Sequence, residues 1–384
     1  YWSFLFADLH PHMIGLAFTL LFVGLCLNLY RAGPQPAAPE IGVPRIWAAL
    51  PSAGRVAGWL LLPLALGALA AINTWDMPTY LGLATAAFLL RAYQGSGRVR
   101  WAAAIAFAVG LAGASYLLYL PFFAHYQAIA VGIGLVRGQG SLGDWLTVWG
   151  FFFFVALSWG LAALSRNRAR MPLLRWARLV GQRWERLPRL TELHGLLVRQ
   201  ASLGYTLALA GVGLFVLLWV ALIALGHQIL AAALLPLGAA FLLLLARPAD
   251  SRQSFATLLL FTGLLVAAGV EVVYMRDFLG GGDHYRMNTL FKFYMQVWVL
   301  LGCGAAAVLP TLWAWIGKGH SRGLRWAWQG ALALLLAGAF LFIPIGTAAR
   351  VADRFPGERP ALGTLDGMAY MTVGRYTWPD QNNP

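Results

Sequence analysis

Charged residues are scarce in this sequence. Only 11% of the 384 residues are Asp, Glu, Lys or Arg, against roughly a quarter in an ordinary soluble domain. Hydrophobic residues make up 60% of the chain, which is more apolar surface than a soluble core needs. This balance excludes an ordinary soluble domain and indicates a bundle of helices that faces lipid.

Cysteine is also rare, and several enzyme signatures are missing. The two cysteines, Cys26 and Cys303, lie inside apolar runs, where cysteine behaves as a small core residue. Their number and placement exclude a disulfide framework and a thiolate metal site. The sequence contains no His-Glu-x-x-His, no Walker-type glycine loop and no Gly-x-Ser-x-Gly. It therefore lacks the signatures of zinc proteases, P-loop enzymes and serine hydrolases.

Long apolar segments are what the sequence has instead. A hydrocarbon core about 30 Å thick takes about 20 helical residues to cross, and lipid leaves backbone groups no partner outside helices or closed barrels. We therefore predict an all-α, polytopic integral membrane helix bundle of about ten spans over residues 1–346. Residues 347–384 are predicted to begin an extracytoplasmic C-terminal segment. The predicted spans are 13–31, 56–75, 77–93, 101–123, 144–164, 202–225, 228–246, 255–275, 288–315 and 326–346.

The charges alternate between the two sets of loops that these spans define. One set holds 20 of the 28 Lys and Arg residues, whereas the other holds ten of the 14 acidic residues. Basic loops stay on the cytoplasmic side of a membrane. The sequence therefore predicts a multi-pass protein of the cell (plasma) membrane, with its acidic and histidine-rich loops on the extracytoplasmic side.

The most basic segment, residues 166–200, has a helical pattern of its own. Its apolar residues recur at steps of three and four, as expected for a helix that lies on a membrane surface. Anionic lipids attract such a segment. No recognised nucleic-acid-binding module accompanies it, so the predicted partners are membrane lipids and not nucleic acid.

The stretch FADLHPHMIGLAFTLL places Asp8, His10 and His12 just before the first span. Carboxylate and imidazole groups suit Mn, Mg or Zn. Pro11 favours an extended backbone at His10, which would let Asp8 and His10 reach one divalent ion, with His12 as a further ligand. The alternative is a polar turn that caps the first span.

A second polar site is predicted in the tight turn INTWDMPTY, where Asp76 lies between two spans and Pro78 opens the next helix. A carboxylate at this position suits a ligand-binding role. The alternative is that Asp76 caps the following helix, with Trp75 and Tyr80 as part of an ordinary aromatic belt.

The third site is GGGDHYRMNTLFKFYMQVW. Asn288, Lys292 and Gln296 recur every four residues, on one helical face. A cation in the first turns of a span is expected to face the bundle or a watery cavity. Arg286 and Lys292, near a helix N-terminus, are typical of a phosphate site. The alternative is that Lys292 pairs with an acid at similar depth and holds two helices together, the candidates being Glu271 and Asp283.

The motifs FADLHPHMIGLAFTLL, NTWDMPTY and GGDHYRMNTLFKFYMQVWVLLG closely resemble conserved blocks of the tri-tyrosine (YYY) membrane protein family of unknown function. The resemblance spans nearly the whole chain, and the family's name-giving tyrosines lie in an N-terminal half that this sequence does not contain. The family in turn is similar to the GT-C glycosyltransferases, membrane enzymes that use polyprenyl-phosphate-linked sugars at the outer face.

This resemblance implies a GT-C-like fold and a glycosyltransferase acting on a polyprenyl-phosphate-linked sugar. Asp8 and His10 match an Asp-x-His pair that binds metal in related enzymes. The donor phosphate would meet a second set of side chains, and carboxylates would orient the acceptor or complete the shell of the ion. The implied phosphate-binding residues are Arg286, Lys292, His284, Tyr285 and Asn288, and the implied catalytic carboxylates are Asp8, Asp76 and Asp283.

Two other functions stay open at this point. One is a transporter or flippase for a lipid-linked head group, although the centres of the predicted spans carry no charges, whereas carriers typically bind their cargo near the midplane. The other is a non-catalytic membrane scaffold, in which the polar loops pair with one another.

Overall fold

The structure of the protein is a computed structural model. It describes residues 10–31, 53–127, 132–138, 140–166, 203–246, 251–277, 282, 284–318, 320–354, 357, 364, 366 and 368–373, without the side chains of residues 12, 53–57, 59, 203–209 and 354. Asp8, Asp283 and most of the basic segment 166–200 therefore lie outside the described residues.

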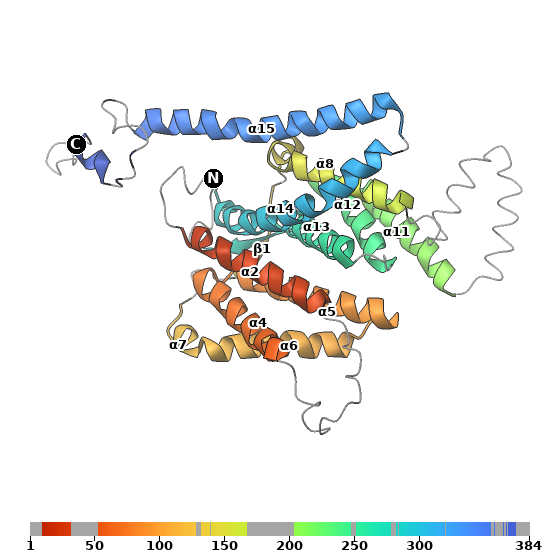
Figure 1. Ribbon diagram of the computed structural model, residues 1–384, viewed down its shortest axis with the longest axis horizontal. Coiled ribbons are helices and arrows are strands. Elements are labelled where there is room, and N and C mark those ends of the chain that lie inside the picture. Colours follow the sequence, from red (N-terminus) through yellow and green to blue (C-terminus); the bar gives the residue numbers. More distant parts are fainter. Residues whose placement is uncertain are drawn as a thin grey trace, which may run out of the picture.

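Long helices dominate the described part of the chain, and each of the ten predicted spans contains one (Figure 1). The prediction of an all-α bundle is confirmed. The helices are α2 (Pro11–Arg31), α4 (Ala53–Ile72), α5 (Asp76–Ser96), α6 (Trp101–Leu118), α8 (Leu142–Arg166), α11 (Leu203–Ala224), α12 (Gln228–Leu245), α13 (Ser251–Gly269), α14 (Met287–Gly317) and α15 (Arg322–Arg354).

Most of these helices can cross a membrane on their own composition. Among the described residues, seven helices are long and apolar enough to do so, namely α2, α6, α8, α12, α13, α14 and α15. Shorter apolar stretches, Leu60–Ile72 and Ala210–Ala224, lie in α4 and α11. Helix α5 packs against α2, α4, α6 and α13. The arrangement is that of a polytopic membrane bundle.

The predicted span 101–123 is interrupted near its end. Helix α6 stops at Leu118, and the four-residue helix α7 (Leu120–Phe123) follows it. Pro121 lies in the first turn of α7, where its missing N–H leaves no gap in the hydrogen bonding. The same residue could not continue α6, because proline cannot donate the backbone hydrogen bond of a helix interior.

The predicted span 255–275 is shorter than expected, and a small sheet follows it. Helix α13 ends at Gly269, and strand β2 (Val273–Arg276) runs antiparallel to strand β1 (Gly132–Leu135). Ile133 pairs with Met275 in this register. The valines after Gly269 favour extended backbone, because β-branched side chains fit a pleated surface. The sheet therefore adds a short cover to one end of an otherwise helical protein.

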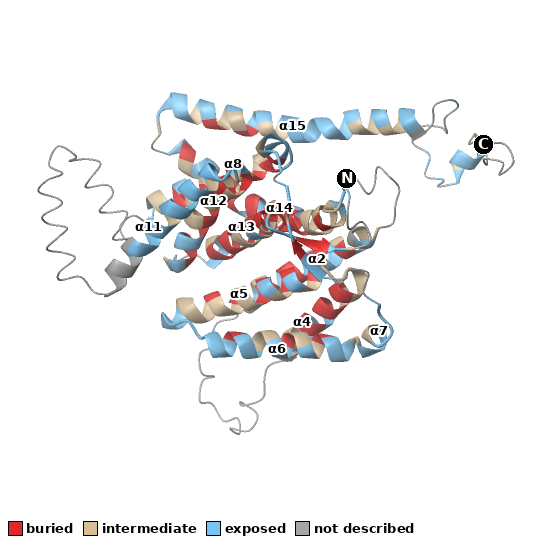
Figure 2. Ribbon diagram, turned by 180° about the vertical axis from the view of Figure 1, so that it is seen from behind, coloured by how far each residue is buried: buried red, intermediate tan, exposed pale blue. Residues whose placement is uncertain are grey.

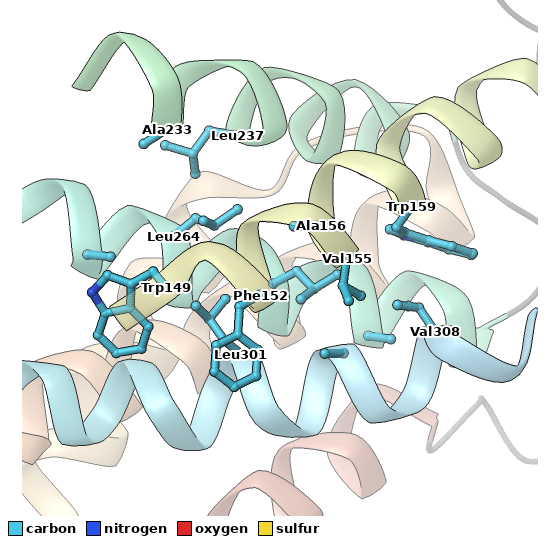
Figure 3. Close-up of a cluster of buried hydrophobic side chains, with 14 of the residues drawn as sticks. Trp149, Phe152, Val155, Ala156, Trp159, Ala233, Leu237, Leu264, Leu301 and Val308 are labelled. Atoms are coloured by element: carbon cyan, nitrogen blue, oxygen red, sulfur yellow. The ribbon is translucent and has the colours of Figure 1, made fainter. Parts of the chain in front are cut away.

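Two clusters of buried side chains hold the bundle together. The larger one lies among α8, α12, α13 and α14, where Trp149, Phe152 and Leu301 pack together (Figure 3). The second joins α2, α4 and α5 and includes Phe22 and Tyr80. Lipid is as apolar as these cores, so close packing and hydrogen bonds, rather than the hydrophobic effect, hold such helices to one another.

Helices α13 and α14 come close together at two glycines. A Cβ atom on Gly304 would lie 2.9 Å from the Leu260 side chain, and a Cβ atom on Gly263 would lie 2.7 Å from that of Leu301. Small residues allow helix backbones to approach in membranes. Since α14 carries the third predicted site, this contact holds the helix of that site against α13.

Helix α15 runs along one side of the bundle and packs against α8 (Figure 1). The indole nitrogen of Trp328 donates a hydrogen bond to Ser158 Oγ at 3.0 Å. None of the described side chains of this helix after Leu332 is buried (Figure 2), and the helix continues to Arg354, beyond the predicted end of the last span at residue 346. The part of α15 after Leu332 therefore faces lipid or water rather than the rest of the bundle.

Candidate functional site

The described residues of the three predicted polar sites lie at one end of the bundle, which we call the polar end. It comprises His10 at the start of α2, the α4–α5 turn at residues 73–75, the β1–β2 sheet and the first turns of α14 (Figure 1). The imidazole of His10 packs edge-on against Phe291, with ring centroids 5.2 Å apart. Trp75 packs against Phe293 at 6.2 Å. Helix α14 thus contacts both other sites.

The carboxylate of Asp76 is buried and tied to α14. Asp76 is 3% exposed. Its Oδ1 atom accepts hydrogen bonds from Gln296 Nε2 and Asn73 Nδ2, each at 2.8 Å. The Gln296 amide also donates to the backbone oxygen of Trp75 at 2.9 Å. A buried carboxylate requires such donors. The Asp76 side chain therefore joins the α4–α5 turn to the face of α14.

The alternative prediction that Asp76 caps α5 is wrong. Asp76 is the first residue of α5, the N-cap is Trp75, and no side-chain bond caps the helix. The carboxylate is instead turned toward α14 by Gln296. Because Asp76 is so deeply buried, its surroundings favour a role in positioning other groups over direct contact with a substrate.

Lys292 is half-buried on the same helix. Its charge interacts with those of Asp277 and Asp76, yet within the described ranges no carboxylate lies at ion-pair distance from its ammonium group. Asn288, one turn earlier, donates a hydrogen bond from Nδ2 to Asp277 Oδ2 at 2.7 Å. A membrane-edge cation without a direct partner is a candidate for binding an anion.

Arg286 is held by an acid. Its Nη2 atom lies 2.6 Å from Glu271 Oε1 and also donates to the backbone oxygen of Val270 at 2.8 Å. The side chains of Arg286 and Glu271 are only 12% and 6% exposed. The alternative pairing of Lys292 with Glu271 is thus wrong, since Glu271 pairs with Arg286. The guanidinium fastens the start of α14 to the end of α13.

Tyr285, in the loop before α14, is bonded to the segment that follows β1. The hydroxyl oxygen of Tyr285 accepts hydrogen bonds from the backbone nitrogens of Arg137 and Gly138, at 2.9 and 3.4 Å. The ring of Tyr285 packs edge-on against that of Tyr274. The Arg137 guanidinium lies 5.9 Å from the centroid of the Tyr285 ring. His284 is exposed. Tyr285 therefore holds the loop, while His284 is open to solvent.

The predicted metal site lies largely outside the described residues. Asp8 and the side chain of His12 are not described, whereas His10 lies beside α14. The part of the chain that the structure describes contains no group of three His, Cys, Asp or Glu side chains that could hold an ion. Metal binding by Asp8, His10 and His12, and a catalytic role for Asp283, stay predictions.

Sequence reasoning missed two residues that shape the polar end. Asp277 accepts the hydrogen bond from Asn288, and Thr289 is buried and accepts a hydrogen bond from the backbone nitrogen of Met275 at 2.9 Å. Asp277 had a sequence signal, because it is an acid just before the glycine loop. Thr289 had none, since its partner belongs to a strand that was not predicted.

The fold and this end together define a class, that of multi-pass, all-α membrane proteins with a polar site at one end of the bundle. The chain belongs to a family of uncharacterized membrane proteins (DUF2298), which its sequence matches over residues 1–301. Neither the search of curated proteins nor the search of solved structures gave a match.

Proposed function

We propose that the polar end binds the donor of a GT-C-like glycosyltransferase, a sugar linked to polyprenyl phosphate, on the extracytoplasmic side of the plasma membrane. The observation that carries the proposal is Lys292, a half-buried cation at the end of a span, without an ion-pair partner among the described residues. A donor with an apolar tail and a charged head has to be bound where apolar and polar surfaces meet.

The surrounding residues divide the work of binding. The Lys292 ammonium would attract the phosphate as a point charge near the N-terminus of α14, whose dipole also favours an anion. Asn288 would exchange its bond with Asp277 for one with a phosphate oxygen. Arg286 would act indirectly, because its bond with Glu271 holds the loop that carries His284 and Tyr285.

Asp76 has the role of a positioning residue. Its bond with Gln296 fixes the α4–α5 turn against the face of α14 that carries Lys292, one turn earlier in the helix. Its charge also favours the charged form of Lys292. Loss of Asp76 would therefore weaken donor binding through Lys292 rather than through a lost contact with the donor.

A divalent ion, Mn, Mg or Zn, is part of the proposal. Asp8, His10 and His12 would hold it, and the contact of the His10 ring with Phe291, the residue before Lys292, supports a place for the ion near the start of α14. When bound, such an ion would neutralise charge on the phosphate leaving group. Lys292 would add to this neutralisation from the side of α14.

The transfer itself would follow the chemistry of glycosyl phosphates. An acceptor hydroxyl or amide attacks the anomeric carbon, the bond between that carbon and the phosphate oxygen breaks, and its electron pair stays on the leaving phosphate. The proton of the acceptor would pass to a carboxylate other than Asp8, which would hold the ion, while Asp283 would orient the acceptor or complete the shell of the ion.

A non-catalytic scaffold is the second candidate, because several polar groups at this end are used to join elements. The pair of Arg286 with Glu271 and the bond between Gln296 and Asp76 both connect segments far apart in the sequence. A scaffold would need these bonds but would have no use for Lys292. Lys292 is therefore the residue that separates the two functions.

The deciding experiment compares the two lysines of the chain, which lie at opposite ends of α14. Wild type, Lys292→Gln and the matched control Lys318→Gln are placed in lipid nanodiscs with a polyprenyl-phosphate-linked radiolabelled sugar. Membranes from cells lacking the protein provide acceptors. We expect label to leave the polyprenyl lipid with wild type and Lys318→Gln, and this transfer to be lost with Lys292→Gln.

Two results would overturn the proposal. Equal transfer by all three proteins would remove Lys292 from the site, and no transfer by any of them would favour the scaffold. In proteoliposomes, movement of intact labelled donor from one leaflet to the other, without loss of the sugar, would identify a flippase instead.

A further inference from the structure

An apolar cavity lies under the β1–β2 sheet, next to the polar end. Its volume is about 170 Å³, and side chains from the α4–α5 turn, α13, α14 and both strands line it. An engineered protein cavity of roughly 150 Å³ holds benzene, so this one has room for a small branched hydrocarbon group. Its lining includes Trp75, Gly269, Val270, Tyr274, Thr289 and Phe293.

The cavity is apolar because its polar groups are satisfied elsewhere. The hydroxyl of Thr289 is bonded to the backbone nitrogen of Met275 at 2.9 Å, and the backbone oxygen of Val270 accepts from Arg286. Water is therefore a poor occupant, since a buried water needs two to four polar partners. Two of the lining residues, Ile133 and Val273, are 67% and 40% exposed. Exposed apolar side chains of this kind are typical of a surface that faces lipid.

Two aromatic rings connect this cavity to the polar end. Trp75 and Phe293 both line the cavity and touch each other, with centroids 6.2 Å apart. Their neighbours in the sequence, Asp76 and Lys292, belong to the polar end. A ligand whose charged head meets Lys292 therefore has an apolar cavity within reach of the atoms next to that head.

From this juxtaposition we infer that the cavity binds the isoprene unit next to the phosphate of a polyprenyl phosphate. The inference rests on the proposed function, which places that phosphate at Lys292. The cavity is compact and partly open to the surface, and its walls come from α13, α14, both strands and the α4–α5 turn. A methyl-branched unit fills such a space, whereas a straight acyl chain of equal carbon number is longer and thinner and leaves part of it empty. Unfilled space forfeits contact energy.

Gly269 offers a way to fill the cavity without distorting the fold. It is the last residue of α13, it lines the cavity, and a Cβ atom built on it meets no atom within 4 Å. Gly302 of α14 is equally open and does not line the cavity. Gly269→Leu and Gly302→Leu are thus a matched pair, and Gly269→Ala gives a smaller step should the leucine prevent folding.

The test measures binding of geranyl phosphate, decyl phosphate, geraniol and inorganic phosphate to each variant in nanodiscs. For Gly269→Leu we expect the affinity for geranyl phosphate to fall by about tenfold or more, because burial of several carbons is lost. The affinity for inorganic phosphate should not change, and Gly302→Leu should behave as wild type. Wild type should bind geranyl phosphate more tightly than decyl phosphate, its straight-chain counterpart.

Unchanged binding of geranyl phosphate in both Gly269→Leu and Gly269→Ala would overturn the inference. So would equal binding of the branched and straight chains by wild type. Failure of the proposed function has a different signature, namely phosphate binding that Lys292→Gln does not alter. In that case geraniol, which has no phosphate, would still report whether the cavity holds a branched chain.

Discussion

Replacing Gln296 by leucine should loosen the polar end from within. The amide of Gln296 donates one hydrogen bond to the carboxylate of Asp76 and one to the backbone oxygen of Trp75, and the residue is 2% exposed. Leucine has a similar size but no donor. Asp76 would keep only the bond from Asn73, while remaining buried.

The expected cost follows from these two bonds. A hydrogen bond to a charged group contributes about 1.5–3 kcal/mol and a neutral one about 0.5–1.5 kcal/mol. Gln296→Leu should therefore lower the free energy of unfolding by about 2–4.5 kcal/mol. Gln253→Leu is the matched control, because the half-buried Gln253 makes no side-chain hydrogen bond within the described ranges. It should cost less than about 0.5 kcal/mol.

Equilibrium unfolding in mixed detergent and SDS micelles would measure these values, and a double-mutant cycle with Asp76→Ala would isolate the pair. We expect the sum of the costs of the two single changes to exceed the cost of the double variant by about 1.5–3 kcal/mol. Costs that add to within about 0.5 kcal/mol would show that Gln296 and Asp76 are not coupled, and the account of the polar end would be refuted.

Two further predictions concern packing and charge. Arg286→Met should lower the free energy of unfolding by about 3–5 kcal/mol, because it leaves Glu271 buried without its partner. Adding Glu271→Gln should recover part of this loss in the same unfolding assay. No recovery would argue against the pair of Arg286 and Glu271. Gly304→Ala should lower the free energy of unfolding by about 1–3 kcal/mol, because its Cβ atom would press on Leu260. The control is Gly302→Ala, whose Cβ atom meets no atom within 4 Å. Equal melting temperatures for the two variants would contradict the close approach of α13 and α14.

The helices of this protein could be predicted because a span must be long and apolar. The sequence predicts the first span at 13–31, and helix α2 begins two residues earlier at Pro11, since proline suits the first turn of a helix. The β1–β2 sheet could not be predicted. Each strand has four residues, and apolar runs this short do not distinguish a strand from the end of a helix.

The candidate site could be predicted in its residues but not in its pairings. Charged side chains are so few near the spans that Asp76, Arg286 and Lys292 stand out in the sequence. Which of them meets an opposite charge depends on the turn after α13. That turn brings Glu271 to Arg286 rather than to Lys292, and no local spacing encodes it.

The most direct test of the central claim is to identify the lipid that co-purifies with the protein. Native mass spectrometry of wild type, Lys292→Gln and Lys318→Gln, each released from nanodiscs, would report the mass of any bound lipid. The account predicts a bound polyprenyl phosphate, free or sugar-linked, in wild type and Lys318→Gln, and its loss in Lys292→Gln. The same lipid in all three, or no phosphate-bearing polyprenyl lipid in any, would contradict it.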